Sequence, residues 1–405
     1  MRIAMVGPFG FHPKKTMRSR AFRLARPLVA RGHEVALFMP PWHTPEEAGR
    51  QWEEDGVRIH YVSLRGGTVG ITHRLVREVL NTRPDVVHCF KPKAYSGLVA
   101  AWLWAFQRRR LRLVVDSDDW EGWGGWNERA PYSWLQKHFF AWQERWGLGH
   151  CHALTVASRA LETLAWGHGV AGERVVYVPN GPGIPIAGGG GRAQERRAAL
   201  GLAERPVLLL YSRLFEFDTQ RLVAILRGVQ ARVPDVVLLA VGSGLYSEDA
   251  VALRRQLEAA GLARAVVDAG WVAEAELPAL LAAADVGLYL MEDNLLNRSK
   301  CPVKLADMLA VGVPVVAERV GQVPEYVRHR ETGLLRAPGE VEGLAGDLVT
   351  LLSEEPLRAR LSENARAHIA RHFSWERLAD RVEVAYQTAR SPGERGEPAA
   401  LSGTH

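Results

Sequence analysis

The chain has 405 residues, enough for two or three domains, and its 47% hydrophobic and 24% charged residues are typical of an ordinary globular protein. Its three cysteines, Cys89, Cys151 and Cys301, lie far apart, which excludes a disulfide framework or a cysteine zinc site and favours a reducing compartment. No apolar run reaches about 18 residues, so we predict no membrane span. We also expect no signal peptide and predict a cytoplasmic protein.

Positive charge is concentrated in the N-terminal part of the chain. Residues 1–110 hold 19 Lys and Arg against 8 Asp and Glu, although the net charge of the whole chain is only +6. A basic region favours an acidic partner, which leaves a phosphorylated substrate, an anionic lipid surface or nucleic acid. The sequence contains no RNA- or DNA-binding motif, and the rest of the chain is acidic, so we predict no nucleic acid partner.

Tryptophan is concentrated in the same part of the chain. Eight of the 13 tryptophans lie between Trp102 and Trp146, mixed with Lys137 and with the arginines at 108–110. Helices rich in Trp and Arg favour a membrane interface, and the protein would then be peripheral on the inner face of the plasma membrane. The alternative is an aromatic core with a solvated basic rim. The sequence leaves both interpretations open.

The first half of the chain alternates predicted strands and helices. A short apolar strand at residues 2–6 is followed by a loop that contains Gly7 and Gly10, and then by a helix at about 16–31. Continuous apolar strands joined by helices predict a parallel sheet that is covered on both faces. The further predicted strands are at 33–38, 57–63, 86–89, 111–115, 155–157 and 175–178.

The pattern starts again near Asn180, where Asn-Gly-Pro-Gly and the glycines at 188–191 predict a linker. A second alternating series follows, with strands at 207–211, 236–241, 266–269, 286–289 and 313–317. We therefore predict an N-terminal domain at 1–180, a second domain at 181–372, a helix at 373–390 that returns to the N-terminal domain, and a disordered tail at 391–405. In such folds ligands bind beyond the carboxyl ends of the strands.

Residues 297–320 combine cations with the start of a helix. Lys300 and Lys304 lie on either side of Pro302, and Asp307 lies one turn into the helix. The backbone N–H groups and the dipole of a helix start favour an anion. A carboxylate further along the helix can hold neutral hydroxyls, so a phosphate next to a ribose is the simplest ligand for this segment.

Six motifs, in order, carry a resemblance to a known family: YVPNGPG at 177–183, YSRL at 211–214, LLAVGSG at 238–244, VDAGWV at 267–272, AADVGLYL at 283–290 and KLADMLAVGVPVVA at 304–317. The chain resembles the retaining GT-B glycosyltransferases of family 4 (glycosyl transferases group 1). The resemblance is almost continuous over 175–335 and looser before it. It implies an α/β GT-B fold, in which two Rossmann-like, doubly wound parallel-sheet domains face a central cleft. The N-terminal domain would bind the acceptor and the second domain the nucleotide-sugar donor.

The resemblance also implies roles for single residues. Arg213 matches the arginine that grips the donor diphosphate, and Asp307 stands where the second glutamate of the family's E-x7-E motif binds the ribose. Gly7 and Gly10 match a loop that approaches the donor phosphates. The predicted donor-binding residues are Gly7, Gly10, Arg213, Gly242, Gly244, Val272, Lys304 and Asp307.

Two departures from the family pattern concern the donor site. Ser299 stands where the first glutamate of E-x7-E is usual, so its sugar contact is missing or comes from Glu292, Asp293 or Asn294. The usual lysine shortly after Arg213 is also absent. Either Lys300 or Lys304 would replace its charge, and the other would be only a solvated helix start. These departures leave the donor sugar open.

The acidic run VVDSDDWEGWGGWNE at 114–128 follows a predicted strand. In the family the corresponding strand often ends in a His-Asp pair, whose histidine contacts the reacting sugar. Aligning the two strand ends puts Asp118 at the position of the histidine and Asp119 at that of the aspartate. Three alternatives remain for these carboxylates: an Asp116-x-Asp118 site for Mg²⁺ or Mn²⁺, structural caps and salt bridges, or active-site groups. We predict that Asp118 positions the acceptor, with Asp116, Asp119, Trp120 and Trp123 on the acceptor side. Trp120 and Trp123 suggest a mobile aromatic loop beside a sugar, and a loop that packs on its own domain is the equal alternative. We expect no divalent metal and no other cofactor.

The predicted reaction transfers a sugar from a nucleotide-diphosphate sugar to a hydroxyl of a glycan, lipid-linked or small-molecule acceptor with retention. It would serve the synthesis of cell-envelope polysaccharides or glycoconjugates. Charge that develops on the leaving diphosphate calls for fixed cations. The catalytic candidates are Asp118, Arg213 and Lys300. The alternatives are a nucleotide-sugar-binding protein with epimerase-like chemistry and, because E-x7-E is altered, an inactive homologue.

Overall fold

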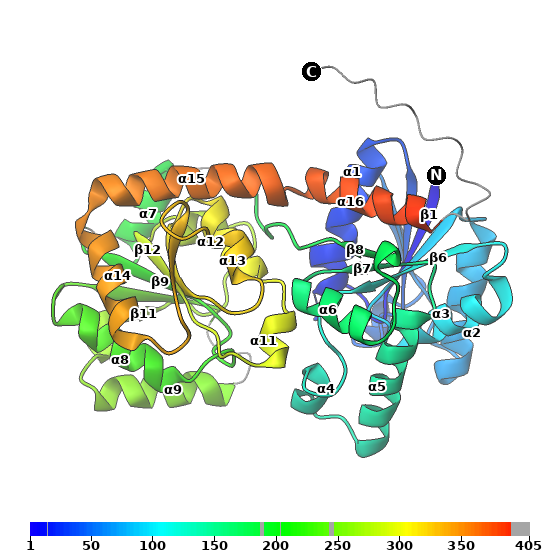
Figure 1. The fold of residues 1–405 in the computed structure, drawn as a ribbon, viewed down its shortest axis with the longest axis horizontal. Coiled ribbons are helices and arrows are strands. Elements are labelled where there is room, and N and C mark those ends of the chain that lie inside the picture. Colours follow the sequence, from blue (N-terminus) through cyan, green and yellow to red (C-terminus); the bar gives the residue numbers. More distant parts are fainter. Residues whose placement is uncertain (14, 187–189, 203, 243–246, 390–405) are drawn as a thin grey trace. The chain divides into compact units, whose positions relative to one another are not determined.

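The computed structural model describes residues 1–13, 15–186, 190–202, 204–242 and 247–389 (Figure 1). They form two compact units. The N-terminal unit comprises Met1–Pro179 together with the chain from Trp375 onward, and the C-terminal unit comprises Asn180–Ser374. Each unit is built on a predominantly parallel sheet with helical connections, which confirms the predicted fold class of two Rossmann-like α/β domains.

The sheet of the N-terminal unit has the strand order β3-β4-β2-β1-β5-β6-β7-β8. Its central strands are mostly apolar and almost entirely buried, as expected of a sheet that is covered on both faces. The edge strand β3 pairs antiparallel with β4 and was not predicted, because its polar sequence QWEE is only half-buried. The strands are β1 (Arg2–Val6), β2 (Glu34–Met39), β3 (Gln51–Glu54), β4 (Val57–Tyr61), β5 (Val86–Phe90), β6 (Arg112–Ser117), β7 (Ala153–Val156) and β8 (Val175–Tyr177).

Helices cover this sheet, and the last helix of the chain is one of them. Helix α16 (Trp375–Thr388) packs on α1 and on β7 and β8, and its Leu378, Val382 and Tyr386 lie in one apolar core with Leu24 and Leu28. The other helices are η1 (Met17–Ala21, a π-helix), α1 (Phe22–Ala30), η2 (Pro45–Glu47), α2 (Gly67–Asn81), α3 (Ala94–Gln107), α4 (Trp126–Arg129), α5 (Trp134–Gly149), α6 (Arg159–Gly167) and η3 (Gly172–Arg174).

The sheet of the C-terminal unit has the order β11-β10-β9-β12-β13-β14, and all of its described pairings are parallel. The chain runs outward from β9 through β10 to β11 and then returns to the other side of β9 with β12. The point where the direction reverses therefore lies between β9 and β12. The strands are β9 (Val207–Tyr211), β10 (Val237–Val241), β11 (Val266–Asp268), β12 (Val286–Tyr289), β13 (Val315–Glu318) and β14 (Gly333–Arg336).

The C-terminal unit also contains a helix that the sequence did not predict. Helix α7 begins at Gly190, inside the glycine run that was predicted to be only a linker, so that prediction is wrong for its last two glycines. Helix α8 starts at Asp218, whose side chain accepts a hydrogen bond from the Gln220 N–H at 2.9 Å. The predicted tail at 391–405 lies outside the described residues.

The helices of the C-terminal unit are α7 (Gly190–Ala199), α8 (Thr219–Gln230), α9 (Ser247–Ala259), η4 (Ala263–Ala265), α10 (Leu277–Leu281), α11 (Leu295–Ser299), α12 (Val303–Ala310), α13 (Val323–Tyr326), α14 (Val341–Ser353) and α15 (Glu355–Phe373). Among the described residues of the whole chain, no helix is long and apolar enough to span a bilayer.

Candidate active site

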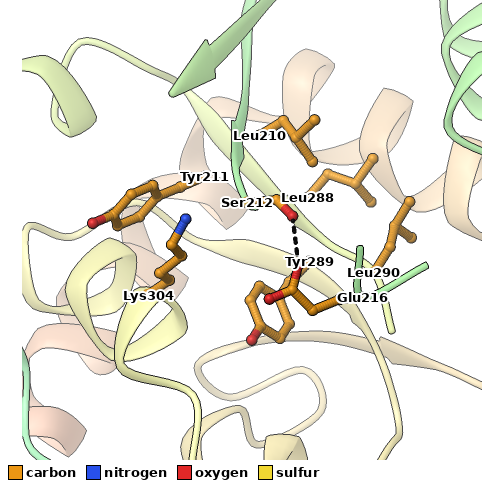
Figure 2. Close-up of a pocket in the computed structure, with 8 residues that line it drawn as sticks. All are labelled: Leu210, Tyr211, Ser212, Glu216, Leu288, Tyr289, Leu290 and Lys304. Carbon is orange, nitrogen blue, oxygen red and sulfur yellow. Dashed lines mark hydrogen bonds between the residues drawn. The ribbon is translucent and has the colours of Figure 1, made fainter. Parts of the chain in front are cut away.

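A small cavity lies at the carboxyl ends of β9 and β12 in the C-terminal unit (Figure 2). Open α/β sheets bind ligands at such a point of reversal, because the loops from the two strands leave it in opposite directions. The cavity is therefore where the fold itself predicts a ligand. Its lining residues are Leu210, Tyr211, Ser212, Glu216, Leu288, Tyr289, Leu290 and Lys304.

Arg213 and Lys300 meet at one carboxylate beside this cavity. Arg213 Nε and Lys300 Nζ each lie 3.5 Å from Glu216 Oε1. The Phe215 ring lies between them, with its centroid 4.0 Å from Lys300 Nζ and 5.0 Å from the Arg213 guanidinium carbon. Burial would raise the pKa of Glu216, but Lys300 and then Arg213 outweigh it and lower that pKa. Glu216 is thus ionised and holds both cations in place.

Lys304 brings a third cation to the same point. Figure 2 shows its ammonium group directed toward Tyr211, whose ring centroid lies 4.4 Å from Nζ. The nitrogen is buried, and within the described residues it has no hydrogen-bond acceptor. Burial first, and then repulsion by Arg213, lowers the pKa of Lys304 to about 7. The expectation that one of the two lysines is only a solvated helix start is wrong, because Lys300 is also buried.

Gly242 leaves the space that Lys304 occupies. It has a φ of +67°, which glycine adopts without strain, and a Cβ at this position would lie 3.3 Å from Lys304 Nζ. A larger residue would press on the ammonium group. Of the other predicted donor-binding residues, Val272 is half-buried in the loop after β11, and Gly244 lies outside the described residues.

Asp307 lies on α12 and is only 2% exposed. The Gly183 N–H donates to Asp307 Oδ1 at 2.5 Å, and a Cβ on Gly183 would come within 3.4 Å of both carboxylate oxygens. The preceding Asn180 is fastened to the same segment, since its N–H donates to Cys301 Sγ at 3.0 Å. The structure therefore brings together the Asn-Gly-Pro-Gly motif and the helix of Asp307, which lie more than 100 positions apart in the sequence.

Ser299 supplies no carboxylate and is fully buried. Its hydroxyl donates to the Leu296 carbonyl at 2.9 Å, within α11. Two of its predicted substitutes have structural partners: Asp293 accepts a hydrogen bond from Arg298 at 2.7 Å, and Asn294 caps α11 by accepting from the Asn297 N–H at 2.9 Å. Glu292 is exposed and remains the candidate for a sugar contact.

Asp116, at the end of β6 in the N-terminal unit, is a structural residue. Its carboxylate is fully buried and forms two hydrogen bonds with Arg20, from Nε at 2.8 Å and from Nη2 at 2.7 Å. The Thr155 hydroxyl donates to it at 2.6 Å. Burial opposes ionisation, but Arg20 outweighs it and lowers the pKa of Asp116. The prediction that Asp116 faces the acceptor is therefore wrong, because Arg20 occupies its carboxylate.

The pairing of Asp116 with Arg20 also bears on the Asp116-x-Asp118 metal alternative. Both Asp116 oxygens already accept hydrogen bonds from the guanidinium group. In the part of the chain that the structure describes, no three His, Cys, Asp or Glu side chains are grouped so that they could hold a metal ion.

Lys91 organises the remaining carboxylates of the acidic run. It follows β5 with a φ of +53°, and its Nζ lies 3.0 Å from Asp118 Oδ1, 3.2 Å from Asp119 Oδ2 and 3.0 Å from Glu121 Oε1. Lys93 pairs with Glu121 at 2.5 Å. Neither Lys91 nor Lys93 was predicted from the sequence as a site residue. Their position directly after a buried strand could have indicated them.

Asp118 is 8% exposed, and this burial shifts the pH range in which its carboxyl group loses its proton. Burial raises the pKa of Asp118 to about 7; Lys91 opposes this rise, whereas Asp119 adds to it. The side chain of Asp119 is 25% exposed, against 9% for that of Asp118. Asp119 is thus the more accessible of the two predicted acceptor-side carboxylates.

Trp120 is part of the domain core. It is 4% exposed, stacks on His168 at 5.8 Å, and its indole N–H donates to the Trp123 carbonyl at 2.7 Å. A Cβ on Gly122 would come within 2.4 Å of the Trp120 ring. Of the two interpretations of this loop, packing on its own domain holds for Trp120, because Gly122 and Gly125 pack tightly around the indole. The prediction that Trp120 faces the acceptor is therefore wrong. Trp123 is 43% exposed.

Gly7 and Gly10 lie in the loop after β1, as predicted. The Gly7 N–H donates to the Phe38 carbonyl at 3.0 Å, and a Cβ there would be 2.4 Å from Met17 Sδ. At Gly10 a Cβ would be 3.0 Å from the Tyr61 hydroxyl oxygen, which accepts from the Phe11 N–H at 2.8 Å. Both glycines therefore serve close packing within this loop.

Two family models match the chain in tandem. The model described as "Glycosyl transferase 4-like domain" matches residues 16–181, and the model described as "Glycosyl transferases group 1" matches residues 205–354. The chain belongs to the group 1 glycosyltransferases with the GT-B fold. The predicted group 1 GT-B family and the predicted enzyme class, a glycosyltransferase, are thereby confirmed, whereas retention stays a prediction.

Individual relatives agree with this family. The phosphatidyl-myo-inositol mannosyltransferase of Mycobacterium leprae is 25% identical over 418 residues, which cover 99% of this chain and all of the relative. The GDP-mannose-dependent alpha-(1-6)-phosphatidylinositol monomannoside mannosyltransferase of Mycobacterium tuberculosis is 31% identical over 193 residues, 46% of this chain and 49% of the relative.

Solved structures show the same fold. HepE of Anabaena in complex with UDP superposes with a TM-score of 0.72 at 19% identity, over 96% of this chain and 100% of HepE. WaaG, a glycosyltransferase involved in lipopolysaccharide biosynthesis, superposes with a TM-score of 0.66 at 18% identity, over 95% of this chain and 99% of WaaG.

Replacing Lys91 tests the buried charge cluster. We expect Lys91→Met to lower the free energy of unfolding by about 3 kcal/mol or more, because three carboxylates lose a shared counter-ion. Urea unfolding measures the loss. The control Lys15→Met removes an exposed lysine of the same unit and should be nearly neutral. Equal stability of the two variants would contradict the role of Lys91.

Proposed function

We propose that this glycosyltransferase moves a sugar from a nucleotide-diphosphate sugar to a hydroxyl of a glycan or lipid-linked acceptor, with retention of the anomeric configuration, in the synthesis of cell-envelope glycoconjugates. The observation that carries the proposal is the group of three cations, Arg213, Lys300 and Lys304, beside the carboxylates of Glu216 and Asp307. This group lies at the carboxyl ends of β9 and β12, where open α/β sheets bind ligands, and a diphosphate would supply the opposite charge.

The chemistry follows from where charge develops. As the bond between the sugar and the diphosphate breaks, negative charge accumulates on the leaving phosphate oxygen. Fixed cations in a buried site stabilise that charge more than water does. In a front-face mechanism with retention, the leaving oxygen takes the proton of the acceptor hydroxyl. No protein base is then required, and Asp118 would position the acceptor.

The cations also bear on metal dependence. Arg213, Lys300 and Lys304 supply the positive charge that a divalent ion would otherwise provide, so we propose that transfer needs no metal. Asp307 is proposed to hold the ribose hydroxyls, and Glu292 the donor sugar. The donor base is best found by thermal shift with UDP-, GDP-, dTDP- and ADP-sugars, because a bound ligand stabilises the folded protein.

The proposed setting is the cytoplasmic face of the plasma membrane. Two lines support it. The relatives named above act on phosphatidylinositol and its monomannoside, as their names state. The three cysteines are all buried and unbridged, which fits a reducing compartment.

Arg213→Ala is expected to abolish transfer and to weaken nucleotide-sugar binding, because it removes the half-exposed cation of the group. Calorimetry with the donor found by thermal shift measures binding, and release of nucleoside diphosphate in the presence of a lipid extract measures transfer. Arg371→Ala, on the exposed face of α15, is the matched control.

Unchanged turnover in Arg213→Ala would sink the assignment of the donor site. Loss of activity in EDTA with recovery in Mn²⁺ would overturn the metal-free mechanism. Donor consumption that yields an epimerised nucleotide sugar and no glycoside would favour the epimerase-like alternative.

The protonation of Lys304 predicts how donor binding depends on pH. The pKa of Lys304 is about 7 in the free protein, and a bound diphosphate favours the charged form and raises it. Binding therefore takes up a proton above pH 7. We expect the Kd to be nearly constant below pH 7 and to weaken by up to about tenfold per pH unit above it.

Calorimetry in buffers of different ionisation enthalpy detects the proton uptake. A nucleotide sugar is the ligand of choice, since its diphosphate does not titrate near pH 7. Lys304→Met should bind more weakly but lose the pH dependence. A variant that keeps the wild-type pH dependence would show that another group takes up the proton.

Asp118→Asn is expected to reduce turnover at least tenfold and to leave donor binding near normal, because Asp118 lies in the N-terminal unit and is proposed to act on the acceptor. Since the pKa of Asp118 is about 7, wild-type turnover should rise with pH through neutrality as the carboxylate forms. The variant should show a flatter profile. An identical profile in both proteins would remove Asp118 from the mechanism.

A further inference from the structure

Helix α5 exposes three large apolar side chains on one face and buries two polar side chains. Leu135 is 71% exposed, Phe139 40% and Trp142 46%, and they follow one another at i, i+4 and i+7 on one helical face. The buried residues of α5 are Ala141, Gly147 and Leu148 together with the polar Gln143 and Glu144, which are 3% and 0% exposed. Large apolar side chains that stay exposed while polar ones are buried are unusual for a helix on a protein surface.

Specific contacts fix this orientation. The Gln143 side chain accepts a hydrogen bond from the Ala94 N–H at 2.8 Å and donates to the Ala94 carbonyl at 3.1 Å, which ties α5 to α3. Glu144 accepts from the Ser117 hydroxyl at 3.1 Å. Burial raises the pKa of Glu144 to about 8, so its carboxyl group is neutral at pH 7. The helix therefore cannot rotate its aromatic side inward without breaking these contacts.

From the exposed rings of α5 a series of half-buried rings continues onto α3. Phe139 stacks on Trp142 at 5.9 Å, and Trp142 lies 6.0 Å from Trp146. Trp146 stacks on His150 at 4.2 Å, and His150 meets Trp104 of α3 edge-on at 5.9 Å. We call Leu135, Phe139, Trp142, Trp146, His150 and Trp104 the aromatic face. In Figure 1, α4 and α5 extend beyond the other helices of the N-terminal unit.

The charge around the aromatic face is positive. Arg145 lies exposed on α5, and Arg108, Arg109 and Arg110 lie exposed at the end of α3 beside Phe106, which is 67% exposed. The one acidic residue of α5, Glu144, is buried on the other side. The surface thus combines large amphipathic rings with arginines and has no acid on the exposed face of α5.

We propose that the aromatic face docks this protein on the surface of an anionic lipid bilayer. Tryptophan prefers the boundary between headgroups and acyl chains, and a helix of this kind buries its apolar side about 5–10 Å into that region. The arginines would meet lipid phosphates. This inference deepens the proposed function, because a lipid-linked acceptor lies in such a bilayer, although docking itself does not require transfer.

The charge also argues against a second copy of this chain as the occupant. In a two-fold symmetric dimer the same patch meets itself, so each copy would place Arg145 and the arginines at 108–110 against a patch that carries the same positive charges. Like charges placed against one another oppose such an interface. A bilayer with anionic lipids provides the opposite charge.

Co-sedimentation of the full chain with vesicles tests the proposal. We expect binding to phosphatidylcholine vesicles with about 30% phosphatidylglycerol, weaker binding to pure phosphatidylcholine, and a decrease with added salt. The triple variant Leu135→Ser, Phe139→Ser, Trp142→Ser should bind at least about tenfold more weakly, because three exposed apolar side chains are removed. All three are exposed, so folding should be retained.

The matched control is Trp166→Ser, which removes a tryptophan of the same unit that is 49% exposed but lies on α6. It should bind vesicles as the wild type does. Replacing Arg108, Arg109 and Arg110 with Glu should reduce binding to anionic vesicles and its salt dependence. Equal vesicle binding by the wild type and the triple variant, or no binding by the wild type, would overturn the proposal.

Two further measurements separate the possible causes of failure. A wild-type dimer in sedimentation velocity that becomes a monomer in the triple variant, without vesicle binding, would assign the aromatic face to a second copy and overturn the bilayer. Donor binding, measured in parallel, should be the same in the wild type and the triple variant. Vesicle binding without sugar transfer would support docking and contradict the proposed function. Sugar transfer without vesicle binding would support the proposed function and contradict docking.

Discussion

The donor side of this protein depends on an unbalanced group of buried charges. Arg213, Lys300 and Lys304 converge on Glu216 at the point where the C-terminal sheet reverses its strand order. Burial first, and then repulsion by Arg213, lowers the pKa of Lys304. In the proposed function a bound diphosphate would supply the opposite charge at this point.

The N-terminal unit treats its charges in the opposite way. Arg20 neutralises Asp116, and Lys91 is surrounded by Asp118, Asp119 and Glu121, so each buried cation there has its anions in contact. These contacts tie the loops after β5 and β6 to the sheet, whereas in the C-terminal unit Lys304 Nζ has no hydrogen-bond acceptor among the described residues. The contrast fits the proposed roles, in which Asp118 positions the acceptor and the cations hold the donor.

Buried polar contacts also explain why one helix shows its aromatic side. Gln143 and Glu144 hold α5 on the domain through Ala94 and Ser117, and the ring series from Phe139 to Trp146 is left outside. A helix that exposes apolar residues loses the stabilisation of burying them. In the N-terminal unit these exposed apolar side chains lie beside a basic surface. A bilayer, as proposed, would bury them.

The sequence by itself determined the two-domain α/β architecture and the strands β9 and β12 to the residue, because hydrophobic periodicity and motif order are local along the chain. That Arg213, Lys304 and Asp307 bind the donor stays a prediction. Only the tertiary structure decided the roles of Asp116, Trp120 and Lys91. The sequence around Asp116 does not show whether its carboxylate contacts an acceptor or Arg20, because Arg20 lies 96 residues away along the chain. Which side of α5 faces inward was likewise set by partners on α3 and β6, since composition cannot say which face of a helix the fold buries.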